Sequence, residues 1–257
     1  MRNRLLSYLS DNGVRLKKGV ALAKGKDGTQ TLRPLKNWSP RQWQVIEGML
    51  LELRHADEQR AHWRSLIAQE VLSDPQLLSL VRLCGIREMV AFALGALIGD
   101  IHRFADPKKL VKYIGLNPAF DDSGKGQWSG GIAGHGRKDL RGLLIESAQA
   151  ILRSNHPLAR WGKKLLARKG SLNLAAGAVA RKLTVAIWYL MTGRWSALEE
   201  IDERLALKVG KIIVGVGTKG LKHLGKTRKL LRQQIYDSLQ TQRIYLLDPN
   251  KKFVPAN

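Results

Sequence analysis

The sequence predicts a mainly α-helical protein, and three observations support this prediction. Apolar residues make up 44% of the chain, a share typical of a globular protein. Apolar residues recur at helical intervals from residue 40 to residue 71, and no proline follows Pro40 in that stretch. Aspartate-proline pairs, which start helices well, occur at Asp74-Pro75 and Asp106-Pro107. We therefore expect a long, coiled-coil-like helical arm followed by a compact helical domain, with small β content in the C-terminal tail.

The N-terminal third predicts two helices separated by a loop. Residues 2–16 form an amphipathic pattern that stops near Gly13. Residues 17–37 hold glycines and lysines and read as a loop. Ser39 is a good N-cap for the arm, because Pro40 takes the first helical position.

The remaining chain predicts short helices and a tail with strands. A tight turn at Cys84-Gly85-Ile86 separates two of the helices, so the outline is that of a helix-hairpin-helix element, which binds DNA backbone; an ordinary helical hairpin is the alternative. Residues 212–216 and 243–254 are β-like. The helices are expected over residues 77–82, 88–97, 108–113, 138–153, 158–168, 174–190 and 221–239.

The composition indicates a nucleic-acid partner. Lys and Arg total 44 against 21 Asp and Glu, a net charge of +23, and residues 147–198 and 204–236 contain no acidic residue. Soluble surfaces normally mix both signs, so a generic solubilising surface is the weaker interpretation. The doublet Arg181-Lys182 lies in the first acid-free stretch and is a candidate for binding nucleic acid.

A glycine-rich stretch, residues 115–141, is the candidate functional loop. Ser123 follows two aspartates and precedes Gly124, so it sits at a tight turn beside cations such as Lys125. Such a serine suits a nucleophile that attacks a phosphodiester, whereas a plain Asp-Ser-Gly turn is the alternative. We expect structural turn roles for three glycines: Gly85, Gly115 and Gly124.

No metal or cofactor site is predicted in this chain. The six histidines show no ligand spacing, Cys84 is the single cysteine, and no nucleotide-binding fingerprint occurs. No secretory signal and no membrane partner are predicted, so we expect a cytoplasmic location.

The residues also resemble a known family across about residues 80–194. These are the insertion-sequence transposases and recombinases of the Piv/MooV type, which pair a RuvC-like acidic (DEDD) N-terminal domain with a C-terminal serine domain and include bridge-RNA-guided members. The matching positions are Cys84-Gly85-Ile86, Ile98 to Phe104, Leu110 to Pro118, Ser123-Gly124, Gly130 to Ile132, Gly136, Leu140-Arg141, Ala148 and Ala180 to Leu183.

The resemblance implies a function and a set of partners. Ser123 corresponds to the serine that joins covalently to DNA, and Arg137, Lys138 and Arg141 would contact phosphates near it. The implied partners are DNA, a guide RNA, further copies of the chain or an intact transposase, in a bacterial nucleoid. Mg²⁺ would be bound by the acidic domain, which this sequence lacks. The sequence therefore predicts a truncated transposase, and a non-catalytic DNA- or RNA-binding derivative is the alternative.

The resemblance also divides the chain into four expected segments. Residues 1–36 would be the end of a RuvC-like domain plus a loop, and residues 37–75 the helical arm. Residues 76–195 would form the serine domain, and residues 196–257 a basic tail.

Overall fold

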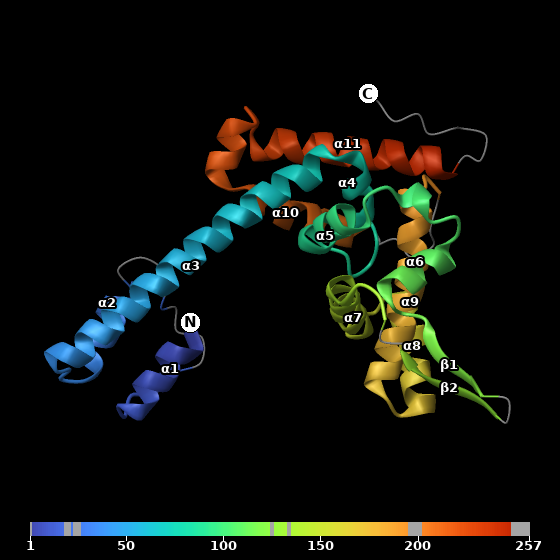
Figure 1. Ribbon diagram of the computed structural model, residues 1–257. Helices are drawn as coiled ribbons and strands as arrows, with labels where there is room; N and C mark the ends of the chain where they lie inside the picture. Colours follow the sequence, from blue (N-terminus) through green and yellow to red (C-terminus); the bar gives the residue numbers. More distant parts are fainter. Residues whose placement is uncertain are drawn as a thin grey trace. The chain divides into compact units, whose positions relative to one another are not determined.

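The fold is mainly helical, as the sequence predicts (Figure 1). The computed structural model describes residues 2–17, 22, 27–123, 126–132, 135–194 and 202–247. Its chain divides into two compact units, Met1–Arg64 and Ser65–Asn257. The division into four segments stays a prediction.

The first unit packs three helices around a small core. They are α1 (Arg2–Asp11), α2 (Asp27–Leu32) with the 3-10 helix η1 (Arg33–Leu35), and the start of α3 (Pro40–Ser73). The Ser39 hydroxyl accepts from the Gln42 amide at 3.3 Å, and the Gln42 side chain accepts from the Ser39 amide at 3.1 Å. This reciprocal capping box starts α3 where the sequence predicts it. The core residues of this unit are Leu5, Leu9, Val14, Leu22, Leu32, Ile46, Leu50 and Leu53.

The second unit contains the end of α3 and most of the helices. The predicted caps form: the Asp74 carboxylate accepts from the amides of Gln76 and Leu77, and the Asp106 carboxylate accepts from the Lys109 amide. Its helices are α4 (Pro75–Val81), α5 (Glu88–Ile98), η2 (Ile101–Arg103), α6 (Pro107–Ile114), α7 (Lys138–Leu152), α8 (Pro157–Lys169), α9 (Leu172–Met191), α10 (Asp202–His223) and α11 (Arg228–Leu247).

Helix α9 is the central helix of the second unit. It packs against α4, α6, α7 and α8, and Figure 1 shows α7 and α8 lying beside it. It is long and apolar enough to cross a bilayer, but 67% of its apolar window is buried inside the protein. The apolar character of α9 is therefore that of a core helix.

Residues 118–132 form a β-hairpin, whereas the sequence indicated a loop. Strand β1 (Pro118–Ser123) pairs antiparallel with β2 (Gly126–Ile132), with Ser123 opposite Gly126. The glycines and aspartates of this stretch are depleted in strands, which is why its propensity pointed to a loop. At the base of the hairpin, Ile132 packs closely on Gly177 of α9. A Cβ added at Gly177 would lie only 3.1 Å from Ile132 Cδ1.

The sequence predicted β structure in the C-terminal tail. This prediction is wrong for the tail residues that the structure describes. Residues 212–216 lie within α10, where Ile212, Ile213 and Val216 are buried. Ile213 and Val216 follow Ile212 by one and four residues, so the three side chains lie on one face of the helix. These branched side chains therefore pack into the core from a helix. Residues 243–247 lie within α11, and residues 248–254 are outside the described ranges.

In the turn between α4 and α5, Gly85 lies against the interior of the protein. Gly85 has φ of +79°, as a tight turn requires. A Cβ at this position would lie 2.7 Å from Ile151 Cγ1 of α7. Close packing against α7 therefore explains Gly85, and DNA contact through this turn stays a prediction.

Candidate nucleic-acid interface

Ser123 is the last residue of β1, at the far end of the hairpin. Its register partner is Gly126, so only Gly124 and Lys125 separate the two strands. Gly124 and Lys125 lie outside the described residues. The role of Ser123 as a nucleophile stays a prediction.

The base of the hairpin is held by a contact between two glycines. Gly115 ends α6 with φ of +80°, and Gly136 has φ of +102°. A Cβ on Gly136 would lie 2.8 Å from the Gly115 nitrogen, and a Cβ on Gly115 would collide with the His135 carbonyl. The Arg137 amide then donates to the Tyr113 carbonyl at 3.0 Å. The segments that enter and leave the hairpin are therefore locked together at a point where only glycine fits.

Two of the predicted phosphate-binding arginines hold this base. Arg141 Nη1 of α7 donates to the His135 carbonyl at 3.2 Å and to the Gly115 carbonyl at 3.5 Å. Arg181 Nε of α9 donates to the Leu116 carbonyl at 3.0 Å. Both side chains are half-buried. Each guanidinium has five N–H donors, so these bonds orient it and leave further donors for an anion.

Arg137 is paired with a carboxylate. Its Nη2 lies 2.7 Å from Asp139 Oδ2, and its Nε donates to Asp139 Oδ1 at 3.1 Å. This bidentate pair raises the pKa of Arg137, and the same hydrogen bonds lower the pKa of Asp139 to about 2. Asp139 therefore stays ionised at neutral pH, and a phosphate that binds Arg137 must compete with it.

Beside the hairpin base lies an open depression of about 500 Å³ with a cationic lining. Three exposed cations contribute to it: Arg103, Lys109 and Lys112. Lys109 and Lys112 are three residues apart on α6, so they share one helical face. The complete lining is Arg103, Phe104, Ala105, Lys109, Lys112, Tyr113 and Gly136.

Aromatic contacts fix the floor of the depression. The Arg103 guanidinium carbon lies 4.6 Å from the centroids of both the Phe104 and the Tyr113 rings. The Tyr113 hydroxyl donates to the Leu97 carbonyl at 3.1 Å and accepts from Arg137 Nη1 at 3.4 Å. Tyr113 thus connects the depression directly to the hairpin base.

The structure therefore brings together Arg137, Arg141 and Arg181 at the hairpin base, whereas within the described residues no hydrogen bond or ion pair joins Lys138 or Lys182 to that base. Lys138 is exposed at the start of α7. Lys182 is exposed on α9, where its Nζ lies 4.6 Å from the Trp161 ring centroid on α8. The sequence interpretation missed Arg103, Lys109 and Lys112. Lys108, Lys109 and Lys112 lie close together on a helix that Asp106 caps. This group of lysines was the sequence signal for Lys109 and Lys112.

Within the described part of the chain, no three His, Cys, Asp or Glu side chains come together to hold a metal ion. Binding of Mg²⁺ by an acidic domain, which the resemblance implies, stays a prediction.

Part of the chain is similar to a known transposase family. Residues 79–161 match the model of the transposase family IS116/IS110/IS902. This segment contains the hairpin, the depression, Arg137 and Arg141. The similarity begins within α4 and ends within α8.

Two curated relatives are also transposases. The transposase for insertion sequence element IS1111A of Coxiella burnetii is 30% identical over 158 residues, which is 60% of this chain and 43% of the relative. A probable family 20 transposase of Pseudomonas aeruginosa is 30% identical over 145 residues, which is 55% of this chain and 43% of the relative. The matched part thus spans less than half the length of either relative.

Proposed function

We propose that this chain binds DNA as the serine domain of an insertion-sequence transposase and that Ser123 is its strand-transfer nucleophile. The observation that carries the proposal is the family match at residues 79–161, which includes both Ser123 at the hairpin end and the cationic depression beside the hairpin base. Phosphate binding by Lys109 and Lys112 would position a DNA strand near the hairpin.

The proposed reaction is a transesterification at a backbone phosphate. The Ser123 Oγ forms a bond to phosphorus, and the bond from phosphorus to a sugar oxygen breaks. The hydroxyl proton passes to a base, and the sugar oxygen takes up a proton. Positive side chains offset charge on the phosphate during this exchange. Mg²⁺ held by an acidic domain would supply activation of the phosphate.

The partners follow from this proposal. An intact transposase would supply the acidic domain, and element-end DNA would be the substrate. A guide RNA, further copies of the chain and a nucleoid location belong to the same proposal.

A second candidate function is nucleic-acid binding without strand transfer. The exposed basic residues of α8 favour it, because binding alone uses these cations. They are Arg160, Lys163, Lys164, Arg168 and Lys169.

The depression can be tested with the double variant Lys109→Gln/Lys112→Gln. We expect about tenfold weaker binding to a DNA duplex near 100 mM salt, and a salt dependence about two units less steep, since each lost phosphate contact removes about one unit. Fluorescence anisotropy of a labelled duplex measures both. The control is Arg4→Gln/Arg41→Gln, which removes two exposed cations from the first unit. Equal losses in the two variants would contradict the assignment.

A further inference from the structure

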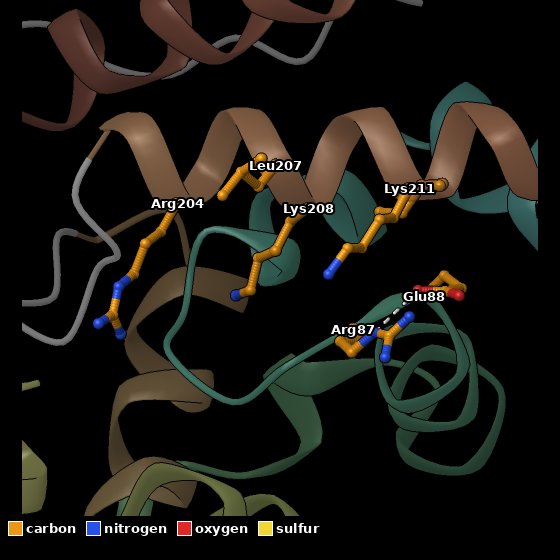
Figure 2. A pocket seen from close by; sticks show the side chains of 7 residues that line it. Arg87, Glu88, Arg204, Leu207, Lys208 and Lys211 are labelled. Carbon is orange, nitrogen blue, oxygen red and sulfur yellow. Dashed lines mark ion pairs between the residues drawn. The ribbon is translucent and has the colours of Figure 1, made fainter. Parts of the chain in front are cut away.

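A second cationic pocket lies at the start of α5, against one face of α10 (Figure 2). It has a volume of about 220 Å³. Its α10 residues lie outside the segment that matches the transposase family. The lining consists of Arg87, Glu88, Arg204, Leu207, Lys208, Lys211 and Ile212.

Lys208 anchors α10 at this pocket. Its Nζ donates to the Val81 carbonyl at 2.9 Å and to the Leu83 carbonyl at 2.6 Å, at the C-terminal end of α4. Arg204, Lys208 and Lys211 are spaced by four and three residues, so they share one helical face. Because Lys208 is held in place, Arg204 and Lys211 are carried at fixed positions on either side of it.

The opposite wall is the start of α5. Arg87 directly precedes the helix in an extended conformation, and its side chain is 56% exposed. Its Nε lies 3.6 Å from Glu88 Oε2, whereas the Glu88 side chain is only 4% exposed. Figure 2 shows the Lys211 side chain extending from α10 into the pocket. The positive end of α5 adds to the field of these cations.

The charge balance of the pocket leaves an excess of positive charge. Among the lining residues that the structure describes, four cations accompany one carboxylate, a formal excess of three positive charges. A cluster that serves only to hold two helices together gains by pairing its charges, because unpaired like charges repel. The bonds of Lys208 to two carbonyls account for that cation, and Arg87, Arg204 and Lys211 are suited to an incoming anion.

We propose that this pocket binds a backbone phosphate of a nucleic acid. Arg87, Arg204 and Lys211 contact the phosphate, and Lys208 positions α10. Arginine guanidiniums match phosphate oxygens through parallel N–H bonds. The inference rests on the proposed nucleic-acid function and extends its binding surface to α10.

The test compares two triple variants with equal loss of charge. The pocket variant is Arg87→Gln/Arg204→Gln/Lys211→Gln, which keeps Lys208 because that residue supports the fold. The control is Lys219→Gln/Lys222→Gln/Lys229→Gln, exposed cations elsewhere on α10 and α11. Anisotropy titrations use a DNA duplex and an RNA duplex of the same sequence. Circular dichroism checks that each variant is folded.

We expect the pocket variant to bind at least about tenfold more weakly at 100 mM salt, with a salt dependence about one unit less steep, and the control to change by about threefold or less. If affinity is lost for only one of the two duplexes, that duplex supplies the phosphate. If the pocket variant is misfolded, Lys211→Gln alone, expected to bind about threefold more weakly, replaces it.

Two results would overturn the inference. If wild-type chain binds and both triple variants lose the same affinity, the pocket is not a phosphate site, while the proposed function stands. If wild-type chain binds neither duplex at low salt, the proposed function fails and the pocket inference fails with it.

Discussion

Replacing Gly115 with alanine is expected to destabilise the second unit by about 2–5 kcal/mol, which combines about 1–2 kcal/mol for a left-handed alanine with about 1–3 kcal/mol for overpacking. The cause is local: Gly115 has φ of +80°, and an added Cβ would collide with the His135 carbonyl. The collision would push apart the two segments that lead into and out of the hairpin. Urea unfolding followed by circular dichroism measures the loss.

Two other glycines separate the causes of this effect. Gly170 also has positive φ, but an added Cβ would meet nothing within 4 Å, so Gly170→Ala is expected to cost only about 1–2 kcal/mol. Gly142 lies inside α7 with open space around it, so Gly142→Ala should stabilise by about 0.5–1 kcal/mol. A Gly115→Ala chain as stable as wild type would refute the close contact at the hairpin base.

Ser123→Ala is expected to abolish a covalent DNA adduct completely, since no other atom replaces the attacking oxygen. The assay mixes this chain with magnesium, element-end DNA and an intact family transposase whose own nucleophilic serine has been replaced. A denaturing gel then reports protein that is joined to labelled DNA. We expect no adduct from this chain alone, because an unassisted serine hydroxyl is a weak nucleophile.

The matched control is Ser129→Ala, a serine on β2 of the same hairpin. Its adduct should equal that of wild type, and Ser123→Ala should keep its DNA affinity because a single hydroxyl is removed. An adduct that survives in Ser123→Ala, or that disappears in Ser129→Ala, would show that the nucleophile is assigned wrongly. If wild type forms no adduct, the binding-only function is the better description.

Most helix starts could be predicted because they depend on neighbouring residues. The caps are Ser39, Asp74 and Asp106. Each side chain accepts a hydrogen bond from a backbone amide two or three residues later, so the cap can be recognised in the sequence alone. The tail could not be predicted in this way. Its run Ile212-Ile213-Val214-Gly215-Val216 is β-branched, yet it is helical because Ile212, Ile213 and Val216 pack into the core of the second unit.

The candidate site was predicted only in part, for a similar reason. Arg141 and Arg181 were expected near phosphates, but they also bind carbonyls that lie 26 and 65 residues away in sequence. The Asp139 partner of Arg137 was two residues away, yet its pairing needed the start of α7 to be in place. Pockets that combine α5 with α10, or η2 with α6 and Gly136, arise from tertiary packing and leave no local pattern.

The salt dependence of DNA binding by the wild-type chain tests the central claim most directly. The claim is that cations of this protein neutralise backbone phosphates. Measured from 50 to 200 mM salt, a plot of log K against log salt should have a slope of about −5 or steeper, which corresponds to about six phosphate contacts. A slope near zero, or no binding at the lowest salt, would contradict the account.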